Sequence, residues 1–277
     1  MAVKDYGSTS YLGGVFWAVL GLAIAVGGPS SGATDPKAAQ SRAKSAQLQG
    51  VWMGLSAAEG ADPRYKGTAW SPKPETVFTP WGAGESKRMA SPITPGECDP
   101  FSPPMMMSDG GLYPIQISQF GDNLVFIYET KAEIRRIYLD GRPHAPDLYP
   151  TWTGDSIGHW DGDVLIIDTI GMNGKWRPLN GYVAGGVYST RVEETPRQPL
   201  SDQTHMVERI RLLEHGQIFE DEITLDDPKT YTKPFTRKVY WQARPDISQL
   251  EYFCSDNQRP DAEGQFSPEA KTSGPPQ

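Results

Sequence analysis

The sequence predicts an all-β protein, an antiparallel up-and-down barrel of about ten strands with two long loops. Three observations predict this fold: short β-branched and aromatic runs, turn residues between them at hairpin spacing, and no strong amphipathic helix between successive runs. Consecutive hairpins can remove their exposed edges by closing on themselves, which favours a barrel over a two-sheet sandwich. At 277 residues the chain has a length that one such domain can fill.

The expected strands lie between clear turn signals, which are Gly121-Asp122, Asp140-Gly141, Asp161-Gly162 and His215-Gly216. Ten strands are expected, near residues 49–55, 113–120, 123–130, 133–139, 154–160, 163–169, 203–213, 217–225, 235–243 and 248–254. Two Gly- and Pro-rich stretches form the long loops. The stretch from 56 to 111 is a candidate lid or wrapping loop, and 171–202 could cover one mouth of the barrel.

The first 33 residues predict a secretory signal peptide. Lys4 precedes an apolar run over 11–28, and small residues follow up to Ala33. An uncleaved membrane anchor is the alternative, because Asp5 weakens the positive start and the run approaches spanning length. Glycines within the run and the small residues after it favour cleavage. We therefore expect a periplasmic or secreted protein that begins at Thr34 and has no stable membrane insertion after cleavage.

The remaining residues, 34–277, are expected to form a single barrel domain with an N-terminal arm and a flexible C-terminal tail. Cys98 and Cys254 are the two cysteines of the chain. In an oxidising compartment such a pair predicts a disulfide, and two free buried thiols are the alternative.

Charge and motifs restrict the class of partner. The formal net charge is −8, and the pI is about 5.1, which makes nucleic acid and anionic membranes poor partners. A hydrophobic small molecule that is neutral or cationic fits better. The sequence shows no nucleophile elbow, phosphate-binding loop or dinucleotide fingerprint, and its four histidines show no ligand spacing. We therefore expect no cofactor and no metal.

The hairpin over 203–225 predicts two carboxylates in the barrel interior. A loop at His215-Gly216 places Arg211 opposite Glu220 and Arg209 opposite Glu222 on the solvent side. The inward face then carries Glu208 and Asp221 as diagonal neighbours in an apolar row. Buried carboxylates of this kind require a cation, a shared proton or water.

Such a pair can supply one acid and one base at neutral pH, although it also occurs in structural networks. The hairpin over 123–139 places Arg135 on the inward face with Tyr128, and a one-residue slip would place Arg136 there instead. The candidate catalytic residues are therefore Glu208, Asp221, Arg135 and Tyr128. Direct contact between Arg135 and Glu208 would instead indicate a structural ion pair.

The hairpin over 154–169 has two apolar faces, so its orientation stays open. Asp155 is expected opposite Asp168, and facing like charges indicate a cation or a proton between them, with simple hydration as the alternative. The candidate ligand-binding residues of the barrel are Trp160, Tyr138, Asp168, Phe126, Phe219 and Met206.

Several motifs together resemble a large family of exported bacterial β proteins, over most of the chain from Gly50 to Cys254. The motifs are Ile137-Tyr138-Leu139-Asp140-Gly141-Arg142, Ser156-Ile157-Gly158-His159-Trp160-Asp161-Gly162-Asp163, Asp168-Thr169-Ile170-Gly171, His205-Met206-Val207-Glu208-Arg209 and Asp226-Asp227-Pro228-Lys229-Thr230-Tyr231-Thr232-Lys233-Pro234. Gly50-x-Trp52 is also similar to the lipocalin entry motif. These resemblances imply a lipocalin- or calycin-like barrel and export.

The family resemblance implies no particular reaction. Glu208, Tyr138 and Asp168 lie at positions that match the family pattern. Asp221 departs from it, because the family is usually apolar there, and residues 174–200 depart as well. The substrate or the lid is therefore expected to differ in this chain.

The residues together predict an exported small-molecule enzyme that uses general acid–base chemistry, of the lyase, isomerase, cyclase or hydratase type, on a hydrophobic ligand in the barrel. A non-catalytic periplasmic carrier of hydrophobic ligands is the alternative. A third interpretation is an envelope interaction protein with a filled barrel.

Overall fold

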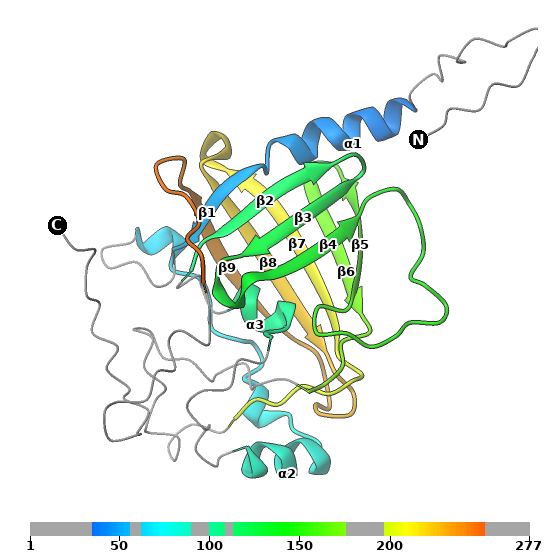
Figure 1. Cartoon of the computed structure of the whole chain (residues 1–277). Helices are drawn as coiled ribbons and strands as arrows, with labels where there is room; N and C mark the ends of the chain where they lie inside the picture. Colours follow the sequence, from blue (N-terminus) through cyan, green and yellow to red (C-terminus); the bar gives the residue numbers. More distant parts are fainter. Residues whose placement is uncertain (1–34, 56–61, 90–99, 109–112, 176–196, 253–277) are drawn as a thin grey trace, which may run out of the picture. The chain divides into compact units, whose positions relative to one another are not determined.

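Nine β-strands close into one barrel in the computed structural model (Figure 1). The structure describes residues 35–55, 62–89, 100–108, 113–175 and 197–252. The chain divides after Thr34, so all of these residues belong to the second unit, which begins at Asp35. The strands are β1 (Gly50–Gly54), β2 (Ile115–Phe120), β3 (Asn123–Tyr128), β4 (Glu133–Tyr138), β5 (Asp155–Asp161), β6 (Val164–Ile170), β7 (His205–Leu213), β8 (Ile218–Asp226) and β9 (Phe235–Ala243).

Three α-helices accompany the barrel: α1 (Pro36–Ala46), α2 (Pro80–Arg88) and α3 (Pro103–Ser108). Short 3₁₀ turns lie at Pro63–Tyr65, Pro74–Thr76, Thr130–Ala132 and Glu214–Gly216. No helix among the described residues is both long and apolar enough to span a membrane. The expected signal peptide, Cys98 and Cys254 lie outside the described residues.

Each strand pairs with its neighbours in sequence, and β9 returns to β1. All pairs are antiparallel except β4–β5, which is parallel. A closed ring with an odd number of strands cannot alternate direction all the way round, so at least one neighbouring pair must be parallel. The expectation of about ten purely antiparallel strands is thus corrected to nine strands with one parallel pair.

Two segments account for that difference. Residues 248–252, the described part of the expected tenth strand, have no strand structure. The expected tight turn at Asp140-Gly141 is the start of a long connection between β4 and β5. A connection of this length can carry the chain back along the barrel, as parallel pairing requires.

The two hairpins that carry the candidate catalytic residues, β7–β8 and β3–β4, have the predicted registers. In β7–β8, Arg211 lies opposite Glu220 and Arg209 opposite Glu222. In β3–β4, Arg135 lies opposite Phe126 on the inward face. The expected ion pair between Arg211 and Glu220 forms at 2.8 Å, whereas the salt bridge of Glu222 is to Lys238, at 3.1 Å.

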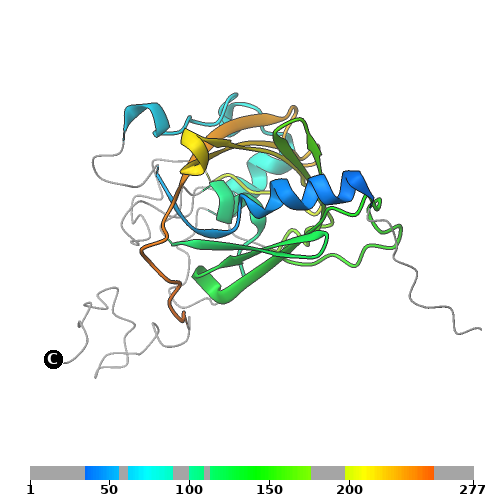
Figure 2. The same ribbon diagram turned by 90° about the horizontal axis from the view of Figure 1, so that it is seen from above.

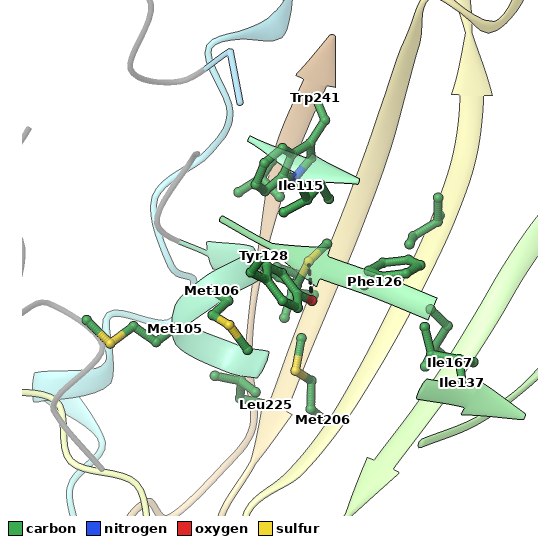
Figure 3. Close-up of a cluster of buried hydrophobic side chains, with 14 of the residues drawn as sticks. Met105, Met106, Ile115, Phe126, Tyr128, Ile137, Ile167, Met206, Leu225 and Trp241 are labelled. Carbon is green, nitrogen blue, oxygen red and sulfur yellow. Dashed lines mark hydrogen bonds between the residues drawn. The ribbon is translucent and has the colours of Figure 1, made fainter. Parts of the chain in front are cut away.

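Helix α3 packs against one end of the barrel and contributes three consecutive methionines to the core. Figure 3 shows Met105 and Met106 near Tyr128, together with Met206 and Leu225 from the barrel wall. Methionine fills irregular space well because its side chain is unbranched and flexible. The helix therefore covers this end of the barrel with adaptable side chains.

Helix α1 crosses the opposite end of the barrel (Figures 1 and 2). Asp35 is the N-cap of this helix, and its side chain accepts a hydrogen bond from the backbone N–H of Lys37. Pro36 is the first helical residue. Trp160 Nε1 donates a hydrogen bond to the Oγ of fully buried Ser45, at 3.0 Å. The N-terminal arm is thus tied to the barrel by its last helical turn.

Residues 62–89 are one of the two described parts of the first long loop, and residues 68–71 hydrogen bond along β9. Isolated bridges pair Ser71 with Thr236 and Phe78 with Tyr231. The ring of Trp70 lies edge-on to Phe235, with 5.1 Å between the ring centroids. Of the two roles expected for the long loop, a lid or a wrapping loop, this segment has the contacts of a wrapping loop.

Candidate functional site

A buried ion pair connects two strands across the barrel interior. Arg135 on β4 and Glu208 on β7 have side chains that are 1% and 0% exposed. Arg135 Nη1 donates to Glu208 Oε1 at 3.0 Å, and Nη2 donates to Oε2. Both carboxylate oxygens of Glu208 are therefore occupied by the same guanidinium group, in the bidentate geometry that arginine favours.

Two hydroxyl groups accept further hydrogen bonds from Arg135, and Tyr128 also lies beside its guanidinium group. Nε donates to Ser156 Oγ at 3.0 Å, and Nη2 donates to Thr169 Oγ1 at 2.7 Å. The two hydroxyls lie 2.9 Å apart and come from the cross-strand pair that joins β5 to β6. Burial acts to lower the pKa of Arg135, but the charge and hydrogen bonds of Glu208 outweigh it, and the net shift is upward.

This contact removes the basis for a general-acid role of Glu208. A proton donor needs an oxygen that can face a substrate, and both oxygens of Glu208 face Arg135. Direct contact between Arg135 and Glu208 is the arrangement expected of a structural ion pair. We therefore withdraw Glu208 and Arg135 as candidate catalytic groups and keep them as a buried ion pair.

Asp221 has no such partner. Its side chain is fully buried on β8, and neither carboxyl oxygen has a hydrogen-bond partner among the described residues. Burial raises the pKa of Asp221 well above its ordinary value, the charges of Glu208 and Glu220 raise it further, and Arg135 and the nearby backbone of Arg209 oppose the shift. Burial without a hydrogen-bond partner thus favours the protonated form of Asp221, which has one O–H to donate.

A second buried polar group lies diagonally across from Asp221. Trp241 faces Phe219 in the β8–β9 ladder, and Asp221 faces the adjacent inward position, Val239. Trp241 is 1% exposed, and its Nε1 has no hydrogen-bond partner within the described part of the chain. Figure 3 shows its indole above Ile115 in the core. Two neutral donors thus share one region of the inner wall.

The hydroxyl of the fourth candidate catalytic residue, Tyr128, already has a hydrogen-bond partner. Its hydroxyl hydrogen bonds to Met107 Sδ at 3.3 Å (Figure 3). Burial raises the pKa of Tyr128 first of all, and Arg135 opposes that effect. The phenol is therefore neutral and held against α3.

The candidate ligand-binding residues divide between the two faces of the barrel wall. Phe126, Phe219 and Met206 lie inside and are fully buried. Trp160 also points inward, near the α1 end, which settles the orientation of the 154–169 hairpin.

Tyr138 and Asp168 lie on the outside of the barrel. Each adjoins an inward residue, Ile137 and Ile167, and successive side chains of a strand alternate faces. Arg142 lies over the ring of Tyr138, 4.0 Å from its centroid. The placement of these two residues in an interior site is therefore corrected.

Asp168 belongs to a cluster on the outer wall. His144, from the β4–β5 connection, places Nδ1 2.8 Å from Asp155 Oδ2 and Nε2 3.0 Å from Asp168 Oδ1. His205 Nε2 lies 2.9 Å from the same Asp168 oxygen. An imidazole thus lies between the two carboxylates, where the sequence indicated a cation or a proton. Asp155 and Asp168 are diagonal neighbours, however, because Asp168 pairs with Ile157.

The same hydrogen bonds shift two ionisation equilibria. The hydrogen bond from His205 lowers the pKa of Asp168, and His144 adds to this, while burial opposes it. The hydrogen bond to Asp168 raises the pKa of His205, and burial opposes that change. No group of three or more His, Cys, Asp or Glu side chains in the described ranges is arranged to hold a metal ion. We assign the cluster to tethering the β4–β5 connection.

The motif that begins at Asp226 has a structural role. Asp227 is fully buried and accepts hydrogen bonds from the backbone and side chains of Ser201 and Thr230 and from the hydroxyl of Thr204. Tyr231 donates from its hydroxyl to the Pro199 carbonyl at 2.6 Å. The motif therefore joins the β8–β9 connection to the segment before β7.

The comparisons with known proteins identify no family. No protein-family model matches the sequence, and no curated protein matches it. Among solved structures, a mutant of the fluorescent protein UnaG is similar over 72% of this chain and 97% of that chain, with 10% identity and a TM-score of 0.30. A similarity of this size identifies no relative. The resemblance to exported bacterial β proteins stays a prediction.

Proposed function

We propose that this protein binds a small apolar molecule inside its barrel. The observation that carries the proposal is Asp221, a fully buried carboxyl group without a hydrogen-bond partner in the described residues, set in an aromatic and aliphatic interior. An unpaired buried polar group costs roughly 1–3 kcal/mol, so its retention is typical of a site that a ligand completes. The methionines of α3 suit an entrance that adapts to the ligand.

Binding without turnover is the form of the proposal that we favour. Of the two inward carboxylates expected to act as acid and base, Glu208 is bound on both oxygens by Arg135. A second candidate function is general-acid catalysis by Asp221, and the observation that favours it is the burial of this carboxyl group without a partner, which raises its pKa. This candidate needs a separate base.

Native mass spectrometry of the mature protein tests the proposal, because a carrier should copurify with an apolar molecule. Titration followed by tryptophan fluorescence provides a second readout. A barrel that carries no molecule and responds to no apolar compound would contradict the proposal.

The Asp221→Asn variant distinguishes the carrier from the enzyme. The amide keeps the shape and one donor but cannot release a proton, so a carrier keeps its affinity. An enzyme that uses Asp221 as its acid keeps binding but loses turnover of the copurified molecule.

We also propose that the protein is exported and works in the periplasm or outside the cell, as the first 33 residues predict. The intact mass of the recovered protein should correspond to a chain that begins at Thr34. A chain that still begins at Met1 in the membrane fraction would favour the anchor instead.

Export would place Cys98 and Cys254 in an oxidising compartment. A disulfide between them could stabilise the protein by about 4–5 kcal/mol in the chain-entropy model. Peptide mapping without reductant should recover the two cysteines in one linked peptide, and alkylation of both in the unreduced protein would exclude the bond.

A further inference from the structure

We infer that the barrel selects a neutral apolar molecule with an acceptor oxygen, such as a ketone, ester or alcohol, and discriminates against carboxylates and plain hydrocarbons. This inference rests on the proposed function, because it names the class of molecule that the interior would take. The residues that carry it are Asp221 and Trp241 as donors, and Arg135 as a cation that is already neutralised.

An anionic ligand requires an unused positive charge, and the interior offers none at Arg135. Its guanidinium group donates to both oxygens of Glu208 and to the hydroxyls of Ser156 and Thr169. A carboxylate ligand would have to displace Glu208 and leave that carboxylate buried without its cation. This exchange is costly, because an uncompensated buried charge is strongly unfavourable.

A second arginine, Arg237, occupies an inward position of the described strands, opposite Ile223. Its guanidinium lies over the ring of Trp70, 5.4 Å from the centroid, on the segment that wraps β9. Arg237 is only partly buried, and this stacking directs it towards the wrapping segment. Arg135 is thus paired with a carboxylate, and Arg237 is stacked on an aromatic ring.

On the described inner wall of β8 and β9, Asp221 and Trp241 are the neutral groups whose polar side-chain atoms have no hydrogen-bond partner. Burial of Asp221, with the negative charges of Glu208 and Glu220 beside it, favours its protonated form, which presents an O–H, while Arg135 opposes this. Trp241 presents an indole N–H and can only donate. Diagonal neighbours on adjacent strands have Cα atoms about 7–8 Å apart, within reach of a large side chain such as tryptophan.

An oxygen acceptor matches these two donors. A carbonyl oxygen has two lone pairs and can accept from both groups at once, and the remaining oxygen of Asp221 can accept from an alcohol. A hydrocarbon of the same size satisfies neither donor. Each net hydrogen bond contributes about 1 kcal/mol, so one bond changes the dissociation constant by about fivefold to tenfold.

The test compares four compounds of equal chain length: a methyl ketone, a primary alcohol, an alkane and a fatty acid at neutral pH. Binding to the mature protein is followed by tryptophan fluorescence and by native mass spectrometry. We expect the ketone and the alcohol to bind at least about tenfold more tightly than the alkane and the fatty acid. Equal or tighter binding of the fatty acid would overturn the inference.

Variants of Asp221 connect the selectivity to the site. Asp221→Leu should abolish the preference for the ketone over the alkane and leave alkane binding within about twofold, while Asp221→Asn, which keeps a donor, should retain the preference. Asp122→Asn, an exposed substitution of the same chemistry, is the control. The wild-type series and Asp221→Asn decide the question if Asp221→Leu does not fold.

Failure of the inference and failure of the proposed function give different results. No binding of any of the four compounds would contradict the proposed function itself. Binding of all four with equal affinity would leave the carrier in place and overturn the selectivity. A crystal structure of the ketone complex in which Asp221 and Trp241 contact only ordered water would also overturn the inference.

Discussion

The carboxylate of Glu208 on β7 lies within hydrogen-bond distance of both terminal nitrogens of Arg135 on β4, with Nη1 3.0 Å from Oε1. Strands β5 and β6 stand between β4 and β7 in the barrel, so the pair bridges the interior. The ion pair thus adds a link between the strands on either side of the parallel β4–β5 junction. At that junction the register pairs only Ile137 with Ser156 and Tyr138 with Ile157.

We predict that removing either partner of this pair destabilises the protein strongly. Arg135→Met or Glu208→Leu alone should lower the free energy of unfolding by about 3–5 kcal/mol, because each leaves one charge buried and unpaired. The double variant should recover most of the loss, since Ser156 and Thr169 still hydrogen bond to each other. Urea unfolding measures all three differences.

The control for this cycle is the half-buried surface ion pair between Arg42 and Asp122, whose side chains are 34% and 38% exposed. Asp122→Asn should change stability by about 0–1 kcal/mol. Additive losses in the double variant would show that Arg135 and Glu208 stabilise the fold independently and would contradict the pairing.

We predict that Asp221 makes the protein less stable as the pH rises from acid to neutral. Below the ordinary value of 3.8 both folded and unfolded forms are protonated, whereas above it the unfolded chain releases its proton and the folded chain retains it. Stability contributed by this group is therefore lost as the pH rises towards the raised pKa. Asp221→Asn should remove this dependence.

The measurement compares the free energy of unfolding of the wild type and Asp221→Asn at about pH 5 and about pH 7. The free energy of unfolding of Asp221→Asn should increase relative to that of the wild type at the higher pH. An unchanged difference between wild type and variant from pH 5 to pH 7 would show that Asp221 is ionised in the folded protein.

We predict that Asp227→Ala destabilises the protein by at least about 3 kcal/mol, because the change leaves several buried donors of Ser201, Thr204 and Thr230 without their acceptor. Asp226→Ala is the matched control, and its partly exposed side chain should make that change cost less than about 1 kcal/mol. Equal losses in the thermal unfolding of the two variants would contradict the assigned role of Asp227.

We predict that the contact of His205 with Asp168 stabilises the protein within a pH window. The pKa of His205 is raised above 6.5, so its contribution is complete below pH 6.5 and is lost as the pH rises through the folded value. The pKa of Asp168 is lowered below 3.8, so its contribution is present above pH 3.8 and is lost as the pH falls.

His205→Gln should therefore differ most from the wild type between about pH 4 and pH 6.5. Histidine NMR titration measures the shift directly, and Asp168→Asn should move the His205 titration back towards its ordinary value. A titration unchanged in that variant would exclude the contact.

The position of Arg135, Glu208 and Asp221 could be predicted from the sequence because strands alternate faces with a fixed period and the turns were recognisable. The contact between Arg135 and Glu208 was foreseen only as one of several outcomes, since β4 and β7 are not neighbours and no local pattern relates them.

His144 could not be predicted as a partner of Asp155 and Asp168, because it lies in a connection without periodicity. The parallel β4–β5 pair was missed for a related reason, since Asp140-Gly141 has the composition of a hairpin turn. The role of Trp241 could not be predicted, because a buried indole is usually ordinary core. That its Nε1 has no hydrogen-bond partner in the described residues is visible only in three dimensions.

The pairing of β1 with β9 also determines the order in which the barrel can form. Trp52 lies opposite Ala243, so the first strand of the ring is completed by the last one in the chain. Until residues 235–243 have left the ribosome, β1 keeps one edge unpaired and the interior open to solvent. Contacts so distant in sequence form slowly, because loop-closure entropy must be overcome first. A nascent chain of this protein would therefore be vulnerable to edge-to-edge aggregation until β9 has been synthesised.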